Sequence, residues 1–242
     1  MFTFLGNIFN VVLYYPLFNA LIAIYDYLPG HDFGLAIIVL TVIIRIILYP
    51  LSVSALHSQI AIQKLQPKIQ EIQDTYKNDK EKQAKETLEL YKKEKINPFS
   101  GLFLVLLQLP ILIALYKVFW NGLNVSELSH VYSFIMKPEY INSVFLGFID
   151  LHNPNILFAI AAGLVQFLQT KMLTPQPSNK KRSNDISVMM QKQMLYLFPI
   201  ITIIILLRLP SALSLYWLAS GVFSIIQQHL IFKKIKTNEV LV

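Results

Sequence analysis

Long apolar runs, separated by one strongly polar stretch, dominate the hydrophobic pattern of this chain of 242 residues. About 20 apolar residues in helical form cross the hydrocarbon core of a bilayer. The pattern therefore predicts five transmembrane helices, over residues 33–53, 98–119, 155–172, 190–207 and 211–232. The uncharged part of the fourth, 193–207, has only 15 residues, which indicates a tilted helix or a locally thinned bilayer.

The N-terminal segment, residues 1–32, is apolar and aromatic but less regular. Pro16, Asn19 and Asp26 interrupt its run over 8–28. Such an interrupted run with several tyrosines is typical of a helix that lies in the membrane interface. The alternative is a sixth spanning helix.

Residues 54–96 have a different character, because Lys, Glu and Gln dominate and glycine is absent. Apolar residues recur there at helical, coiled-coil-like spacing: Leu65, Ile69, Ile72 and Tyr76, and then Ala84, Leu88 and Tyr91. With a turn at Lys77–Lys80, the pattern predicts a hairpin of two antiparallel helices. The hairpin could dock a partner or serve only as a linker between the first two spanning helices.

Composition assigns the fold class. The chain is 55% hydrophobic and 14% charged, with a mean hydropathy of +0.51, as in an all-α polytopic membrane protein. It has no cysteine, which excludes disulfides, thiolate metal sites and cysteine nucleophiles.

The basic residues define a topology. Three stretches, 64–95, 171–192 and 233–236, hold 17 of the 21 Lys and Arg residues, and residues 1–44 hold none. Basic loops stay in the cytoplasm. The hairpin and the short basic tail, 233–242, are therefore expected inside, with the N-terminus and residues 120–155 and 208–212 outside. The N-terminus lacks the basic start and the cleavage site of a signal peptide.

Arg45 lies within the first predicted spanning helix. A guanidinium at that depth costs from about 2.5 to more than 10 kcal/mol and cannot lose its proton. It therefore marks a functional site by default, unless it reaches the interface or pairs with a carboxylate. The other four predicted spans contain no Asp or Glu.

Further polar and interfacial residues recur in the predicted helices. Thr41 lies four residues before Arg45, on the same helix face. The other candidates are Gln108, Gln166, Ser214, Tyr216, Trp217 and Ser220. A single Gln or Ser is usually an interhelical hydrogen-bonding group, but several around one Arg favour a water-filled cavity.

Catalysis is not indicated. None of the five histidines, His31, His57, His130, His152 and His229, lies in mid-membrane or at ligand spacing from another. Nucleotide-binding and hydrolase motifs are also absent. We therefore expect no catalytic residues, no metal, no cofactor and no enzymatic activity.

Several short stretches together resemble the YidC/Oxa/Alb family of membrane protein insertases. In chain order they are Arg45–Leu51, Leu65–Lys68, Asn97–Gly101, Leu107–Tyr116, Gly163–Phe167, Phe198–Pro199, Leu215–Leu218 and Gln227–Gln228. The resemblance covers roughly residues 14–232 and implies a five-helix core, residues 97–232 with the first helix, around a hydrophilic groove. It also implies a bacterial cell membrane location.

The resemblance carries roles to individual residues. Arg45 matches the groove arginine, Thr41 a position that contacts substrate, and Trp217, beside Tyr216, the aromatic contact of the last helix. Nascent membrane proteins and lipids are the implied partners, with the ribosome and the Sec translocon as further candidates and DNA not among them. Gly221 departs from the family pattern, in which Asn is common. The short tail weakens the case for ribosome docking through it.

The implied mechanism needs no nucleotide hydrolysis. A short acidic tail of the client enters the groove near Arg45, and its apolar segment then moves along helices 155–172 and 211–232 into lipid. A small transporter or channel with the same polar cavity is the main alternative. A membrane scaffold for the hairpin is a third, which leaves Arg45 unexplained.

Overall fold

The computed structural model describes residues 2–97, 99–121, 125–174 and 186–240. Within these residues the chain is mainly helical, which confirms the predicted class of all-α membrane protein. The helices are α1 (Phe2–Phe9), η1 (Asn10–Tyr14), α2 (Tyr15–Tyr27), α3 (Phe33–Ile47), α4 (Tyr49–Thr75), α5 (Lys80–Lys93), α6 (Ser100–Asn121), η2 (Val125–His130), α7 (Ile156–Leu173), α8 (Ile186–Leu206) and α9 (Ser211–Val240). Two short strands, β1 (Val144–Phe145) and β2 (Ile149–Asp150), complete the set.

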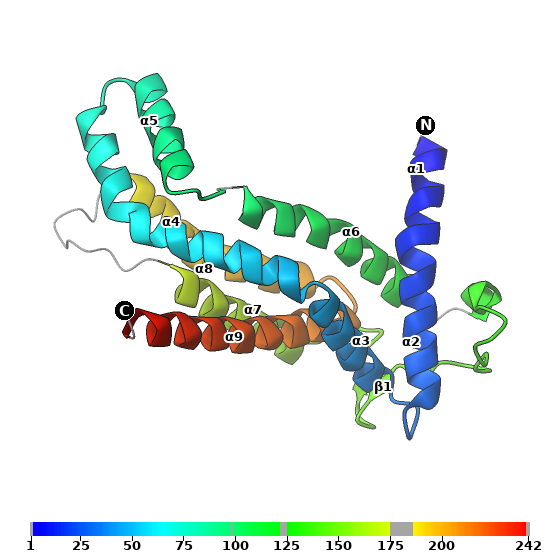
Figure 1. Ribbon diagram of the computed structural model, residues 1–242. Coiled ribbons are helices and arrows are strands. Elements are labelled where there is room, and N and C mark those ends of the chain that lie inside the picture. The colour runs from blue at the N-terminus through cyan, green and yellow to red at the C-terminus, as the bar shows by residue number, and fades with distance from the viewer. Residues whose placement is uncertain (1, 98, 122–124, 175–185, 241–242) are drawn as a thin grey trace.

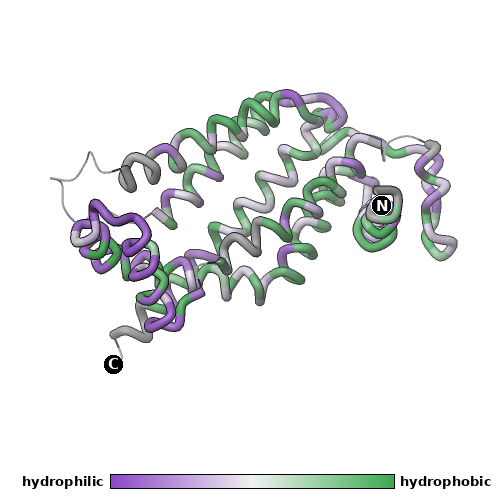
Figure 2. The backbone as a smooth tube through the Cα atoms, turned by 90° about the horizontal axis from the view of Figure 1, so that it is seen from above, coloured by the Kyte–Doolittle hydropathy of each residue, from purple (hydrophilic) through white to green (hydrophobic). Residues whose placement is uncertain are grey.

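The helices form an elongated bundle with distinct ends (Figure 1). Helix α7 packs on both α8 and α9, and α3 packs on α9. The α4–α5 hairpin and the C-terminus lie at one end, and the β-strands and η2 lie toward the other. Figure 2 shows that hydrophilic residues concentrate in the hairpin, whereas the long helices of the bundle are mainly hydrophobic.

Three described helices are long and apolar enough to cross a membrane: Gly6–Tyr27, Ile156–Leu173 and Ser211–Ile235. The bent pair Phe33–Ile47 and Tyr49–Thr75 would be a fourth span. The apolar parts Leu106–Trp120 of α6 and Leu195–Leu206 of α8 are shorter. The chain is thus polytopic, and the predicted count of five spans remains a prediction.

The first predicted span, 33–53, is broken near its end in the structure. Helix α3 stops at Ile47, and after Leu48 the chain bends by 64° into α4. Pro50 is the cause, because its ring lacks an N–H and clashes with the carbonyl of the preceding turn. Residues 49–53 therefore begin the helix that continues into the hairpin.

Helix α4 ends at Thr75 and α5 begins at Lys80, on either side of the turn predicted at Lys77–Lys80. The Asp79 carboxylate caps α5 by accepting from the Lys82 backbone N–H at 2.9 Å. Leu65 and Ile69 are buried as expected, but Ala84 and Leu88 are exposed. The apolar positions of the first arm are therefore better covered than those of the second.

Helices α1, η1 and α2 form one continuous rod that runs crosswise to α7, α8 and α9 (Figures 1 and 2). The buried Asn19 side chain joins this rod to the loop that follows η2. Its amide donates to the His130 carbonyl at 3.1 Å, and its oxygen accepts from the Tyr132 N–H at 2.7 Å. The crosswise direction fits an interfacial helix, although the length and apolarity of Gly6–Tyr27 also suit a span.

The region predicted as an irregular outer loop contains a small antiparallel hairpin, in which Val144 pairs with Asp150 and Phe145 with Ile149. Asp32 joins it to α3 by capping the Leu35 N–H at 2.9 Å and accepting from the Leu146 N–H at 2.7 Å. A Cβ on Gly34 would lie 2.1 Å from the Phe145 ring. Only glycine therefore permits this contact.

Candidate functional site: a polar groove around Arg45

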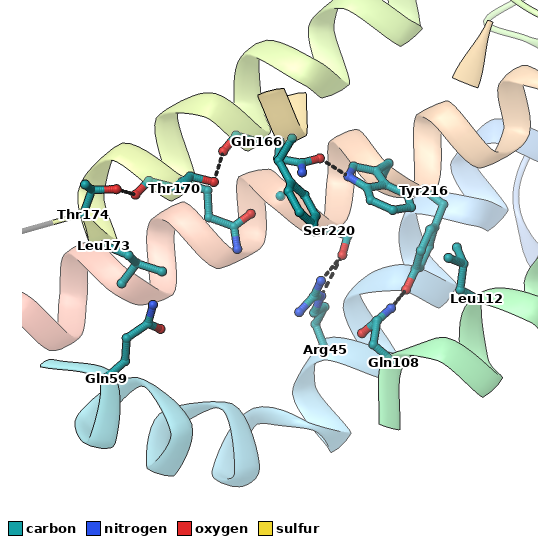
Figure 3. A pocket seen from close by; sticks show the side chains of 14 residues that line it. Arg45, Gln59, Gln108, Leu112, Gln166, Thr170, Leu173, Thr174, Tyr216 and Ser220 are labelled. Atoms are coloured by element: carbon teal, nitrogen blue, oxygen red, sulfur yellow. Dashed lines mark hydrogen bonds between the residues drawn. The ribbon is translucent and has the colours of Figure 1, made fainter. Parts of the chain in front are cut away.

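A cavity of about 530 Å³ lies among six helices. Its wall combines a cation, amides, hydroxyls and a few apolar side chains: Arg45, Gln59, Gln108, Leu112, Gln166, Gln169, Thr170, Leu173, Thr174, Phe198, Tyr216, Trp217, Ser220 and Gly221. Figure 3 shows these residues converging from opposite sides of the space. We call this cavity the polar groove.

Arg45 projects from the last turn of α3 toward α9. Its Nε donates to the Ser220 Oγ at 2.8 Å, and its Nη2 donates to the same oxygen. Among the residues that the structure describes, no carboxylate forms an ion pair with Arg45. A guanidinium has five N–H donors, so most of its hydrogen-bonding capacity and its whole charge remain available to the groove.

Two further hydrogen bonds connect the walls. The Gln108 amide of α6 donates to the Tyr216 hydroxyl of α9. The Trp217 indole N–H donates to the Gln166 Oε1 of α7 at 2.9 Å. These bonds explain why single polar residues lie on separate helices, since each residue forms a hydrogen bond with a polar group on a neighbouring helix.

The structure brings six of the eight predicted site residues into this groove: Arg45, Gln108, Gln166, Tyr216, Trp217 and Ser220. It places the other two elsewhere. Thr41 is 1% exposed, and its hydroxyl donates to the Ile37 carbonyl of its own helix at 2.6 Å. Ser214 is fully buried, and its hydroxyl has no hydrogen-bond partner among the described residues.

One physical cause explains why Thr41 and Ser214, expected in the groove from the sequence, lie outside its wall. The pattern identifies the helix on which a polar residue lies, but the packing of α3 on α9 decides which face is covered. Both residues lie outside the groove wall.

Several groove residues were missed from the sequence. Gln59 was assigned to a separate hairpin because the bend at Pro50 was not predicted, yet α4 carries it into the wall. Thr170 follows Gln166 by four residues, and Thr174 follows Thr170 by four, so helical spacing from a predicted residue could have found both. The hydroxyl of each donates one turn back within α7, at 2.9 and 2.8 Å (Figure 3).

Helix α4 of the hairpin contacts the end of α7 and the C-terminal half of α9. The Gln63 amide donates to the Leu173 carbonyl at the end of α7. The Gln227 amide of α9 donates to the Ser52 hydroxyl at 2.8 Å. Leu56 and Ile60 pack with Ile231 in a small apolar cluster. The first arm of the hairpin is therefore part of the groove wall.

Glycine permits the close approach of α9 to α7 beside the groove. A Cβ on Gly221 would lie 2.6 Å from the Val165 Cγ1. Asn, which is common at this position in the insertase family that the chain resembles, would thus require Val165 to move.

A second, apolar pocket of about 320 Å³ adjoins the polar groove. Leu112 and Trp217 belong to both walls. The remaining lining comes from α6, α8 and the start of α9: Ile113, Tyr116, Thr202, Ile205, Leu206, Leu209 and Leu213. Helix α6 packs mainly on α4, η1 and α2, whereas α8 packs mainly on α7, so the pocket lies where these two groups of helices meet.

Comparison with known proteins assigns the chain to a protein family. The family described as 60Kd inner membrane protein matches residues 23–238. The chain is 35% identical over 203 residues to a membrane protein insertase YidC of Fusobacterium nucleatum, which covers 84% of this chain and 87% of the relative. It is 33% identical over 231 residues to that of Oceanobacillus iheyensis, with 94% and 84% covered.

A relative of the same name from Geobacter metallireducens is longer. It is 35% identical over 224 residues, and the match covers 93% of this chain but only 37% of the relative. Family match and relatives agree over nearly the whole length described here. The chain belongs to the 60Kd inner membrane protein family.

Proposed function

We propose that this chain inserts membrane proteins through the polar groove. The observation that carries the proposal is a guanidinium without an ion-pair partner among the described residues, in a cavity that adjoins an apolar pocket. The names of the relatives support the same function. A client that is inserted has both a polar tail and an apolar segment, and the two cavities match these two parts.

In the first step, the client's short polar tail enters the polar groove from the cytoplasm. Acidic residues in the tail are attracted to Arg45, and this attraction is stronger in a partly buried groove than in bulk water. Gln59, Gln166 and Thr170 offer further hydrogen-bonding groups in the same groove as Arg45. The tail therefore exchanges water for protein partners at a depth where lipid would offer none.

In the second step, the apolar segment leaves the groove for lipid. The apolar pocket supports an exit between α6 and α8, in place of the route along 155–172 and 211–232 expected from the sequence. Trp217 and Leu112 stand at the junction of the two cavities. Burial of apolar surface, at about 25 cal/mol per Å², drives this step without nucleotide hydrolysis.

The proposed orientation puts the hairpin and the C-terminus in the cytoplasm, with five spans and the α1–α2 rod in the outer interface. The distribution of the 17 clustered basic residues supports it. Because the chain has no cysteine, single cysteines at Ser129 and at Lys85 can be labelled from one side. Ser129→Cys should react with an impermeant reagent in intact cells, and Lys85→Cys should react only after the membrane is opened.

The hairpin is the proposed contact for cytoplasmic partners. Residues 54–96 hold nine Lys against seven Asp and Glu, and basic side chains are attracted to anionic headgroups and to RNA. The ribosome and the Sec translocon are candidate partners on this basis, beside clients and lipids.

The decisive experiment is insertion of a short single-span client into liposomes that contain only this chain. We expect protease protection of the client without added nucleotide, and none in empty liposomes. A fluorescent solute trapped in the same vesicles separates this function from that of a transporter or channel. Release of the solute without client insertion would reject the proposal.

A further inference from the structure

The two adjoining cavities have the chemistry of an amphipathic ligand that is not a protein. We propose that the groove, when no client occupies it, holds an anionic phospholipid. Its phosphate lies at Arg45 and one acyl chain lies in the apolar pocket between α6 and α8. This inference rests on the proposed function only in naming what the client displaces.

The charge of Arg45 requires a partner in the resting protein. Its only hydrogen-bond acceptor among the described side chains is the neutral Ser220 hydroxyl. An uncompensated cation at membrane depth is costly, and the cost falls when an anion or water reaches it. Lipid phosphate is the anion present at high concentration in the membrane, and a guanidinium binds phosphate through paired N–H donors.

The apolar pocket decides between a lipid and a free anion. Of its nine lining residues, Thr202 is the only one with an aliphatic hydroxyl, and it is 7% exposed. Ile113 and Ile205 are 56% and 51% exposed, so the pocket opens on the apolar surface of α6 and α8, which lipid chains cover in a membrane. The acyl-chain site and the headgroup site meet at Leu112 and Trp217. One lipid molecule can therefore occupy both sites.

A resident lipid has a consequence for insertion. The client's tail and the phosphate compete for Arg45, and the client's apolar segment and the acyl chain compete for the same pocket. Clients with acidic tails would therefore displace the lipid more readily than clients with neutral tails.

Lipid binding can be measured without any client. The purified chain in neutral detergent is mixed with equal amounts of dioleoyl phosphatidylglycerol and dioleoyl phosphatidylcholine, and bound lipid is counted by native mass spectrometry. Both lipids carry a phosphate, but the choline cation of phosphatidylcholine is repelled by the charge of Arg45. We therefore expect about tenfold preference for the anionic lipid. Arg45→Gln should remove the preference, whereas Arg208→Gln, on the exposed outer turn, should keep it.

A second variant tests the acyl-chain site in the apolar pocket independently of Arg45. Ile113→Trp fills the apolar pocket and should reduce binding of dioleoyl phosphatidylglycerol severalfold without reducing binding of the dihexanoyl form. Ile160→Trp, on the exposed face of α7 outside the pocket, is the matched control. Thermal melting of each variant shows that it is folded.

Equal binding of the two headgroups by the unmodified chain would overturn the proposal. So would an unchanged headgroup preference in folded Arg45→Gln, or displacement of the lipid by inorganic phosphate at equal concentration, which would mean a free-anion site. Because no client is present, any of these results leaves liposome insertion as a separate test of the proposed function.

Discussion

Arg45 and Ser220 lie 175 residues apart in the chain, and the guanidinium donates to the Ser220 hydroxyl from both Nε and Nη2. This pair joins α3 to α9 at the wall of the polar groove. The hydroxyl holds the guanidinium in place without neutralising it, so position and charge can be tested separately.

Charge is tested at Arg45. Arg45→Ala should reduce insertion of clients with acidic tails about tenfold or more, because hydrogen bonds to charged groups contribute about 1.5–3 kcal/mol. Arg45→Lys should retain much of the activity, because attraction needs charge more than the planar fork of the guanidinium. Insertion into liposomes at matched protein content measures both. Full activity of the alanine variant would contradict an electrostatic role.

Position is tested at Ser220, with Ser214 as a matched control on the same helix. Ser220→Ala removes the acceptor of a partly buried cation and should lower the free energy of unfolding by about 1–3 kcal/mol. Ser214→Ala removes a buried hydroxyl that has no hydrogen-bond partner among the described residues, so it should be neutral or stabilising. Thermal unfolding in detergent measures both, and equal losses would show that Ser220 has no special role.

The client path is tested by site-specific crosslinking to a stalled client. A photoreactive residue at Gln59, Gln108, Gln166 or Trp217 should crosslink, because these residues line the groove. Thr41 and Ser214 serve as buried controls of similar depth, at 1% and 0% exposure. Equal yields from the two sets would leave the groove without support as the client path.

Asp150, in the loop before α7, gives a prediction of pH-dependent stability. The Ser143 hydroxyl donates to its carboxylate at 2.7 Å and, with the His152 N–H and the Asn153 amide, holds the pKa of Asp150 below its ordinary value near 3.8. A depressed folded-state pKa means that this contribution to stability is present above about pH 4 and is lost as pH falls through the folded pKa.

Ser143→Ala should therefore raise the pKa of Asp150 toward its ordinary value. The change in the pKa of Asp150 can be measured by NMR. The carboxyl carbon shifts of aspartate-labelled protein in detergent are followed in a titration from about pH 6 to about pH 2. Ser133→Ala, an exposed serine of the same loop, is the control and should leave the titration unchanged. An unaltered Asp150 titration in Ser143→Ala would mean that the hydrogen bond does not set the pKa.

The hairpin is tested by removing only its distal part. A deletion of 70–92 with a short linker leaves Gln59, Ile60 and Gln63 in contact with the bundle, so thermal stability should change little. Client insertion should fall severalfold if the basic arms receive the client or a partner. Normal insertion would show that these arms are a passive linker.

Much of this molecule could be predicted from its sequence because lipid imposes a simple rule on it. Apolar runs of sufficient length become helices, and one Arg among them needs polar neighbours from other helices. Arg45, Gln108 and Gln166 could thus be assigned to one site before any helix was positioned, and the family resemblance added Trp217.

The remaining features depend on packing and on local breaks. Thr41 is buried because it lies on the face of α3 that packs against α9. The sequence pattern of one helix does not reveal which of its faces a neighbouring helix covers. The bend at Pro50 directs the first arm of the hairpin so that Gln59 reaches the groove wall, and this proline was present in the sequence. The pairing of Phe145 with Ile149 was not predictable from so short a strand.

The contact between Gly221 and Val165 constrains how relatives can diverge. Since a Cβ at position 221 would lie 2.6 Å from the Val165 side chain, a larger residue at one position requires a smaller residue at the other or a wider helix spacing. The two positions should therefore change together during evolution. Lineages that carry Asn in place of Gly221 should then carry Ala or Gly in place of Val165, and the paired exchange should be tolerated where Gly221→Asn alone is not.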